Sequence, residues 1–313
     1  MKSTPAMHCR SVPWSYRIAA LAGFAVLLAS CGTVELSGDT LHRVDKALES
    51  RKKPSLRTWQ EDQGEGGRAK LLKLAELQTG LLLRWDTVSI TSEPTNRHSV
   101  NWTVSMKGKT GSIASAVPLT RDGYFLTAAH CVERGPMTLV IATRDRKMTK
   151  KQVRVVWKGD MDRRGPDLAI IHANLEPLLP FRGADAATLA PGDEVAITGW
   201  SGLSDGTPNG GTAAGHVISV SNLKQDRTGA AWRTIRHDVP LNSGDSGGPL
   251  FTPQGLCLGI NAKVEVGPAG LLGTRFGLAG NTDKPLGGYV GESVAPEPGW
   301  LRSVIEADRK LKN

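Results

Sequence analysis

From about Val100 onward, the chain is a succession of short apolar runs separated by glycine, proline, asparagine and aspartate. Short runs between turn-forming residues are typical of β-strands, and their regular spacing favours an all-β barrel or sandwich. A helical bundle would instead need longer stretches with a helical period. The runs are Tyr124–Ala128, Leu139–Ala142, Val153–Val156, Leu168–Ile171, Glu194–Thr198, His216–Val220 and Leu256–Ile260.

The end of the chain breaks this pattern. Within residues 298–312, the side chains of Trp300, Leu301, Val304 and Ile305 form one apolar stripe at helical spacing. The stripe predicts a C-terminal helix that packs on the body of the fold.

The segment of residues 31–99 also differs from the strand-rich part. Leu41, Val44 and Leu48 fall at helical spacing, and the leucine-rich stretch Leu71–Leu77 predicts a second helix. This segment contains no motif that carries chemistry. We therefore expect a partly helical N-terminal extension, which serves as a spacer or packs against the body.

The first part of the chain has the features of an export signal. Residues 1–17 carry basic but no acidic side chains, and residues 18–30 carry no charge. Such an uncharged stretch is too short to span a bilayer but fits the apolar part of a signal peptide. Leu28–Cys31 resembles the lipobox of bacterial lipoproteins, which implies a lipoprotein signal peptide over residues 1–30 and acylation of Cys31.

Gly32 follows the predicted acylation site. A residue other than aspartate at this place resembles the lipoproteins that are sorted to the outer membrane. We therefore expect an exported, membrane-anchored protein that faces the periplasm or the cell surface. An ordinary cleaved signal peptide with a chance cysteine is the alternative.

The formal net charge of +9 permits binding to anionic partners. No nucleic-acid-binding motif accompanies it, so we interpret it as a solvated basic surface and expect no nucleic-acid partner. We find no metal-ligand spacing and no phosphate-binding glycine loop, so no cofactor and no metal are expected.

Candidate residues for acyl transfer by serine occur in the strand-rich part. In the run Asn242–Leu250, glycines on both sides of Ser246 permit a tight turn that leaves the serine hydroxyl open to a substrate. The N–H groups of Gly244 and Ser246 could converge on a developing oxyanion.

A histidine and an aspartate could complete this chemistry. His130 ends the run Leu126–Cys131, where small residues lead to a single histidine. Asp167 opens an apolar strand, and a carboxylate that enters a core needs a partner such as His130. Asp160 and Asp162 are rivals, but they lie in a polar run that is typical of a solvated loop.

Thr127–Cys131, Asp167–Ala169 and Gly244–Pro249 resemble, in this order, the TAAHC, DLA and GDSGGP motifs of trypsin-like serine peptidases. The resemblance extends from residue 100 to about residue 310, so we expect a peptidase domain over residues 100–313. It implies two six-stranded antiparallel β-barrels, with the active site between them, and a C-terminal helix.

The resemblance also implies a role for each residue. His130 would be the general base and then the general acid, Asp167 its orienting carboxylate, and Ser246 the nucleophile. The N–H groups of Gly244 and Ser246 would form the oxyanion hole.

Three departures from the family pattern follow. Cys131 has no upstream cysteine to pair with after Cys31 has been acylated, so we expect Cys131 and Cys257 to be buried, unpaired thiols. Ala262 occupies a place where many relatives have a hydroxyl side chain near the triad carboxylate. Asp245 would need a donor other than a new N-terminal amine, such as an arginine, because an acylated N-terminus is not available.

The specificity pocket is expected from the resemblance at Pro240, Leu241 and Asn261. None of these can pair with a cation, so the pocket suits small or aliphatic side chains. Asp238 would change this preference if a shifted loop brought it into the pocket. The glycine- and proline-rich residues 263–297 are interpreted as an insertion near the substrate cleft.

Together these observations predict a lipid-anchored serine endopeptidase that acts on protein or peptide substrates. A binding or adhesion module with the same fold and weak or no catalysis is the alternative. An esterase that uses the same serine chemistry is a third possibility.

Overall fold

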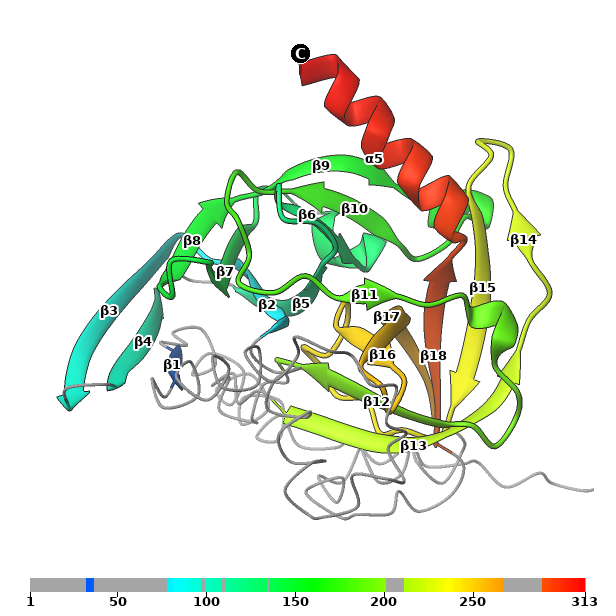
Figure 1. Ribbon diagram of the computed structural model, residues 1–313, viewed down its shortest axis with the longest axis horizontal. Coiled ribbons are helices and arrows are strands. Elements are labelled where there is room, and N and C mark those ends of the chain that lie inside the picture. The colour runs from blue at the N-terminus through cyan, green and yellow to red at the C-terminus, as the bar shows by residue number, and fades with distance from the viewer. Residues whose placement is uncertain are drawn as a thin grey trace, which may run out of the picture.

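The computed structural model describes residues 32–36, 78–96, 99–107, 111–133, 135–200, 211–266 and 289–312. These residues form two main β-structures and one long helix (Figure 1). The predicted mostly-β architecture is therefore confirmed.

Six strands in the second half of the chain close a barrel. The ring consists of β12 (Glu194–Gly199), β13 (Gly211–Val220), β15 (Ala231–His237), β18 (Tyr289–Pro296), β17 (Leu256–Val266) and β16 (Pro249–Phe251). Each strand pairs antiparallel with the next, and β16 pairs with β12 to close the ring. Val195, Ile197, Ile235 and Leu250 belong to its hydrophobic core. One of the two expected six-stranded barrels is thus present.

Two short strands extend this barrel. β11 (Arg182–Gly183) pairs in parallel with β17, and β14 (Lys224–Gln225) pairs antiparallel with β15. The predicted insertion at residues 263–297 begins and ends in the barrel itself, because β17 continues to Val266 and β18 begins at Tyr289.

The first half of the chain forms an open sheet. In spatial order it contains β8 (Met148–Gln152), β7 (Thr138–Ala142), β2 (Gly80–Arg84), β5 (Ser112–Pro118), β6 (Tyr124–Thr127), β10 (Ala169–His172) and β9 (Arg154–Lys158). In the described part of the chain β8 and β9 do not pair with each other, so the expected second closed barrel is not confirmed. Strand β8 carries the exposed Lys150 and Lys151. Charged lysine side chains are typical of an edge strand, because they disfavour pairing with a further strand. The sheet also includes β2, which precedes residue 100.

A smaller sheet projects from this open sheet at the left of Figure 1. It has the order β1–β4–β3, with β1 (Gly32–Leu36), β4 (Ser99–Lys107) and β3 (Thr87–Asn96). The smaller sheet packs on the open sheet through one hydrophobic cluster, in which Val88, Val104 and Met106 contact Leu81 and Val140.

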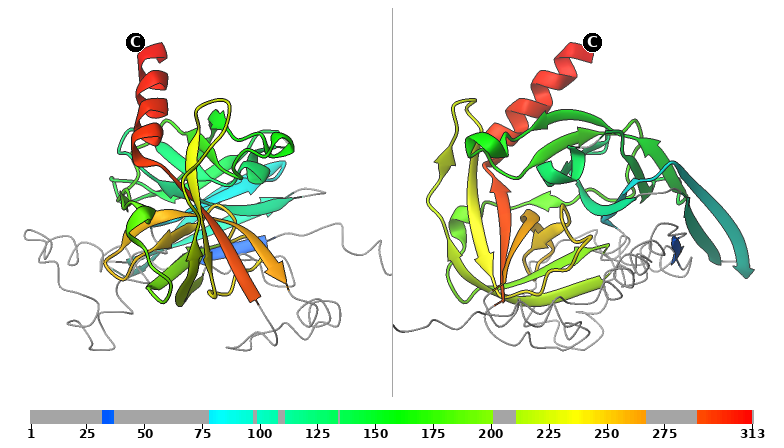
Figure 2. Two further views of the ribbon diagram at one scale, coloured as in Figure 1. Left: turned by 90° about the vertical axis from the view of Figure 1, so that its right-hand side faces the viewer. Right: turned by 180° about the vertical axis from the view of Figure 1, so that it is seen from behind.

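The predicted C-terminal helix is confirmed as α5 (Pro298–Lys312). Ile305 is buried and Trp300 packs edge-on against Trp157 of β9, with ring centroids 4.7 Å apart. The carboxylate of Glu297 accepts hydrogen bonds from the N–H groups of Gly299 and Trp300, at 2.8 and 2.5 Å, and so caps the helix. Figure 2 shows that the helix extends past both β-structures.

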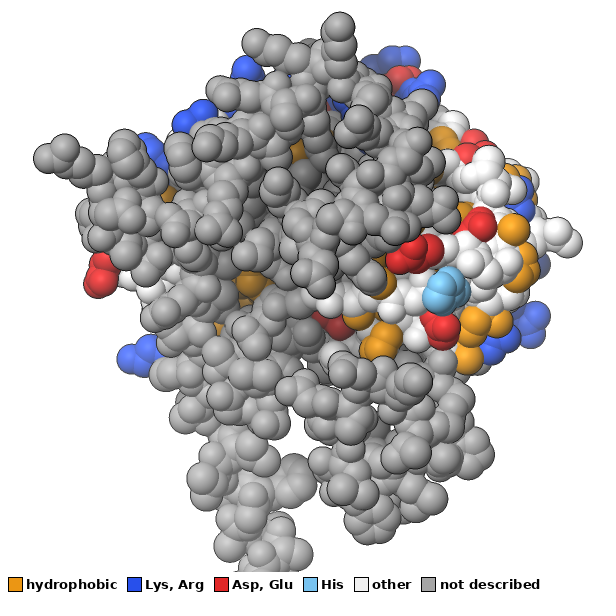
Figure 3. Space-filling view, turned by 60° about the horizontal axis from the view of Figure 1, so that its bottom comes forward, with side chains coloured by type: hydrophobic (Ala, Val, Ile, Leu, Met, Phe, Trp, Pro, Cys, Tyr) orange, Lys and Arg blue, Asp and Glu red, His pale blue; other side chains and the backbone are white. Residues whose placement is uncertain are grey.

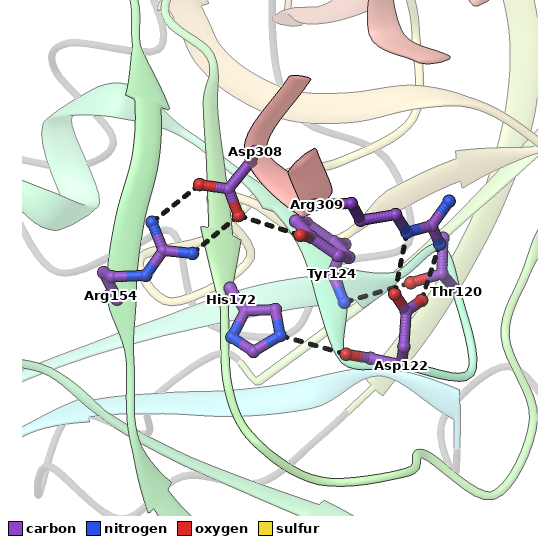
Figure 4. A network of polar contacts seen from close by, with 7 residues as sticks. All are labelled: Thr120, Asp122, Tyr124, Arg154, His172, Asp308 and Arg309. Carbon is purple, nitrogen blue, oxygen red and sulfur yellow. Dashed lines mark hydrogen bonds and ion pairs between the residues drawn. The ribbon is translucent and has the colours of Figure 1, made fainter. Parts of the chain in front are cut away.

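A polar cluster fastens α5 to the open sheet (Figure 4). Arg154 at the start of β9 makes two hydrogen bonds to Asp308 of α5, at 2.9 and 2.6 Å. The hydroxyl of Tyr124 at the start of β6 donates to the same carboxylate at 2.8 Å. Burial and the hydrogen bond to Asp308 raise the pKa of Tyr124 to about 12. We call Tyr124, Arg154 and Asp308 the helix clasp.

A second ion pair lies beside the helix clasp. Arg309 donates to both carboxylate oxygens of Asp122, at 2.8 and 2.7 Å, and its guanidinium lies 5.4 Å from the centre of the Tyr124 ring. The hydrogen bond from Arg309 lowers the pKa of Asp122 to about 2. The helix that follows the barrel is therefore held on strands of the other β-structure.

One hydrophobic core joins the three parts. Phe125 and Ile170 of the open sheet, Phe251 and Ile260 of the barrel, and Ile305 of α5 belong to the same buried cluster. Because this core is continuous and closely packed, it holds the loops of the open sheet in a defined position relative to the loops of the barrel.

Several sequence predictions fall outside the described residues. These are the signal peptide, Cys31 and the helices expected near Leu41–Leu48 and Leu71–Leu77. No helix among the described residues is long and apolar enough to cross a membrane.

Among the described residues, side chains of several types share the underside of the protein. In Figure 3, acidic, hydrophobic and histidine side chains are interspersed, and Lys and Arg side chains lie toward the margin of the described surface.

Candidate active site

His130 and Asp167 are brought together by the pairing of β6 with β10. His130 lies in a short 3-10 helix, Ala129–Val132, directly after β6, and Asp167 lies just before β10. The two strands pair antiparallel, with Ala169 opposite Thr127, so the end of one meets the start of the other.

Two hydrogen bonds join these residues. His130 Nδ1 lies 2.7 Å from Asp167 Oδ2, and the backbone N–H of His130 donates to Asp167 Oδ1 at 3.0 Å. The carboxylate thus fixes both the position of the residue and the orientation of its ring. The rival Asp160 is engaged elsewhere, because it accepts a hydrogen bond from the N–H of Arg163 at 3.3 Å.

The pKa of His130 is raised above its ordinary value. The main cause is the hydrogen bond to the Asp167 carboxylate, and the neighbouring Cys131 side chain adds to it. The imidazole is 39% exposed, so solvent and a substrate can reach the side that does not face Asp167.

The loop that carries Ser246 joins β15 to β16. Its glycines have left-handed backbone angles, with φ of +103° at Gly244 and +82° at Gly247. A Cβ atom on Gly247 would lie 2.2 Å from both Ser115 O and Thr127 Oγ1, so only glycine fits there. The glycines that flank Ser246 are thus required by the turn, as the sequence predicted.

The Ser246 loop lies against the element that carries His130. The Ser246 carbonyl accepts a hydrogen bond from the Ser115 N–H at 2.8 Å and from the Cys131 thiol at 3.9 Å. Cys131 directly follows His130, so the backbone of Ser246 lies close to the histidine. Ser246 itself is half-buried.

The donor that Asp245 needs comes in part from its own loop. Asp245 is 4% exposed, and its Oδ2 atom accepts a hydrogen bond from the N–H of Asn242 at 2.8 Å. The N–H of Asp245 in turn donates to the Asn242 carbonyl at 3.1 Å. This pair of bonds stabilises the turn before Ser246.

The three residues expected in the specificity pocket differ in exposure. Pro240 is half-buried, whereas Leu241 is 4% exposed and Asn261 is fully buried. The Asn261 amide donates to the Asp245 carbonyl at 3.4 Å, beneath the Ser246 loop. Asn261 therefore supports the loop from within the barrel.

A buried histidine that the sequence did not single out lies next to Asn261. The Ser293 hydroxyl donates to Asn261 Oδ1 at 3.1 Å, so its oxygen is free to accept from His237 Nε2, 3.0 Å away. His237 is fully buried against Gly291, and burial lowers its pKa to about 4. The ring is therefore neutral at ordinary pH.

Asp238 does not face the expected pocket residues in this structure. Its Oδ1 atom accepts a hydrogen bond from the N–H of His216 at 2.6 Å, and its side chain is 53% exposed. The carboxylate is thus engaged at the surface of β13.

The expectation for the cysteines is confirmed. Cys131 and Cys257 are both buried and unpaired. Burial raises the pKa of the Cys257 thiol to about 12, so this thiol is protonated and unreactive.

Residues 89–270 match the family model described as Trypsin. The chain is 27% identical over 196 residues to a probable periplasmic serine endoprotease, DegP-like, from Halomonas elongata, and 30% identical over 162 residues to a protein of the same description from Chlamydia trachomatis.

These matches cover only part of the relatives. They span 62% and 51% of this chain but 38% and 30% of the two proteins. Among solved structures, the HtrA-type protease AlgW with decapeptide matches with a TM-score of 0.51 and 18% identity, over 76% of this chain and 67% of that one. This last likeness concerns the fold.

Proposed function

Because the chain belongs to the trypsin family, we propose that it is a serine-type endopeptidase that hydrolyses peptide bonds through an acyl-enzyme. The observation that carries this proposal is the His130–Asp167 pair, hydrogen-bonded at 2.7 Å beside the glycine-flanked loop of Ser246. The names of the curated relatives agree with it.

The proposed mechanism gives each residue one task. Ser246 Oγ attacks the carbonyl carbon of the scissile bond while its proton passes to the imidazole of His130. Asp167 holds the imidazole in the required tautomer and stabilises the imidazolium that forms. The N–H groups of Gly244 and Ser246 stabilise the oxyanion, and His130 then donates its proton to the leaving amine.

For the second half of the reaction, a water molecule replaces the amine. His130 accepts a proton from this water, the hydroxide adds to the acyl carbon, and collapse of the intermediate returns the proton to Ser246. The acid product leaves and the enzyme is regenerated.

We further propose a preference for small or aliphatic side chains before the cleaved bond. Pro240, Leu241 and Asn261 offer no carboxylate for a basic side chain. The engagement of Asp238 with His216 supports this preference, because it holds the acid two residues before Pro240 at the surface.

The proposed location is a membrane surface outside the cytoplasm, through acylation of Cys31. The apolar stretch before Cys31 supports export, and the curated relatives are described as periplasmic. A protein substrate is the proposed partner.

Labelling with a fluorophosphonate tests the proposed chemistry, because this probe reacts covalently with an activated serine. We expect the wild type to be labelled and Ser246→Ala not to be labelled. Ser243→Ala is the matched control, since Ser243 is an exposed serine in the same loop, and this variant should react like the wild type. A folded wild-type protein that resists the probe would favour the binding or adhesion module.

A further inference from the structure

Ser115 lies on β5 in the middle of the open sheet, yet its contacts reach the barrel. The residue is fully buried, and β5 pairs with β2 on one side and β6 on the other. Its hydroxyl and its N–H group both bind backbone atoms of the Ser246 loop. The residue therefore links the two β-structures at the candidate active site.

The hydroxyl of Ser115 has one possible orientation. The N–H of Trp200, just after β12, donates to Ser115 Oγ at 2.9 Å. Ser115 Oγ lies 2.8 Å from the Gly244 carbonyl, which can only accept, so the hydroxyl proton points to that carbonyl. Both bonds are buried, where polar groups depend on their partners.

The main chain of Ser115 holds a second carbonyl of the same loop. Its N–H donates to the Ser246 carbonyl at 2.8 Å. One buried residue thus binds the carbonyl groups of Gly244 and Ser246, on either side of Asp245.

The Gly244 carbonyl belongs to the peptide unit that lies between the two proposed oxyanion donors. Gly244 has φ of +103°, a conformation that glycine enters and leaves easily. Rotation of this peptide would change the angle between the N–H groups of Gly244 and Ser246. Within the loop, the N–H of this peptide unit donates to the Asn242 carbonyl at 3.1 Å. The Ser115 hydroxyl adds a bond from outside the loop that helps to keep both donor groups directed at one point.

We propose that Ser115 is a positioning residue for the oxyanion hole: its hydroxyl fixes the Gly244 carbonyl, so that the two N–H donors are already aligned before a substrate binds. The proposal rests on the endopeptidase function proposed above. Ser115 is buried behind the loop and does not itself contact a substrate. Removing the Ser115 hydroxyl should therefore weaken stabilisation of the transition state and leave substrate binding nearly unchanged.

The test uses a tripeptide p-nitroanilide with alanine at the cleaved bond and the matching tripeptide aldehyde. Ser246 adds to the aldehyde carbon while its proton passes to His130, and the former carbonyl oxygen occupies the oxyanion hole. For Ser115→Ala we expect kcat to fall about tenfold to a hundredfold, less than for loss of a donor itself, with KM within about twofold. Aldehyde affinity should fall by a similar factor.

Thr143→Val is the matched control for the loss of a buried hydrogen bond. Thr143 Oγ1 lies 2.9 Å from the Lys147 carbonyl oxygen, in the turn between β7 and β8, and the residue is 6% exposed. This variant should lose stability comparably but keep kcat and aldehyde affinity. If Ser115→Ala does not fold, Ser115→Cys retains a weaker donor of similar shape and should give a smaller fall in kcat.

Unchanged kcat and aldehyde affinity in the folded Ser115 variants would overturn the positioning role, and so would an equal fall in Thr143→Val. An inactive, unlabelled wild type would instead contradict the endopeptidase function itself. The two failures are therefore distinguishable.

Discussion

The two hydrogen bonds between His130 and Asp167 couple the charge of the imidazole to the neighbouring carboxylate. A histidine can act as a general base only in its neutral form. The carboxylate raises the pKa of His130, so the neutral form appears at higher pH than for a free histidine. The same contact that orients the base therefore sets the pH range of the proposed reaction.

Replacing Asp167 with Asn should change both the rate and the pH profile. In the wild type, peptidase activity should rise with pH and reach its midpoint above about 6.5, the ordinary histidine pKa. In Asp167→Asn, loss of the carboxylate lowers that midpoint, and the plateau should fall by about four orders of magnitude because the ring is held in the wrong tautomer. Measuring kcat/KM between about pH 5 and about pH 9 checks both effects.

Asp160→Asn is the control for this measurement, because Asp160 accepts its hydrogen bond from Arg163 and not from His130. Its profile should match that of the wild type. A large loss in Asp160→Asn or Asp162→Asn, with Asp167→Asn active, would assign the carboxylate elsewhere.

Single residues differed in how well their roles could be predicted from the sequence. His130, Asp167 and Ser246 stand in local motifs that carry their own signal. Ser115 has no such motif, because its partners Gly244 and Trp200 are 129 and 85 positions away. His237 is likewise defined by Ser293 and Asn261, which only the closed barrel brings to it.

At the scale of elements, α5 is the clearest link between the barrel and the open sheet. It follows β18 of the barrel, yet its clasp residue Asp308 binds Tyr124 and Arg154 of the sheet. Tyr124 begins β6, the strand that leads to His130. The helix clasp thus supports the strand from which the proposed base extends.

Asp308→Asn should destabilise the protein more than loss of the neighbouring ion pair. Asp308 is 8% exposed, and the substitution removes the charge that faces Arg154, so we expect a loss of about 1–3 kcal/mol in the free energy of unfolding. Arg309→Gln breaks a pair whose side chains are 43% and 49% exposed, and it should cost less than about 1 kcal/mol. Urea denaturation of both variants measures the difference, and equal losses would contradict a special role for the clasp.

The elements with a strong apolar pattern were predicted well. Tyr124–Ala128 corresponds to β6, and Leu256–Ile260 lies within β17. Strand β8 was not predicted, because its sequence MTKKQ is polar and lies at a sheet edge where exposed lysines are favourable. An edge strand has little apolar periodicity for a sequence pattern to reveal.

At the scale of the whole molecule, closure of a sheet depends on pairing between distant strands. β18 closes the barrel by pairing with both β15 and β17. In the other half, the same kind of short strands form an open sheet in the described part of the chain. Local patterns predict such strands, but they do not determine whether the first and last of them meet.

The proposed anchor belongs to this scale, because it determines where the whole protein resides. Cys31→Ser should move the protein from the membrane fraction to the soluble exported fraction, since serine offers no thiol for acylation. Cys9→Ser is the matched control, because Cys9 lies within the predicted signal peptide and should not alter the partition. Fractionation followed by immunoblotting measures it, and a Cys31→Ser protein that stays with membranes would rule out this anchor.

The position of β18 also has a consequence for the order in which the protein is made. The barrel that holds the Ser246 loop is complete only when residues 289–296 are in place, after all three proposed catalytic residues have been synthesised. A chain that is still emerging during translation or export therefore lacks the last wall of this barrel. We therefore expect the growing polypeptide to lack the proposed peptidase activity until residues 289–296 have been added.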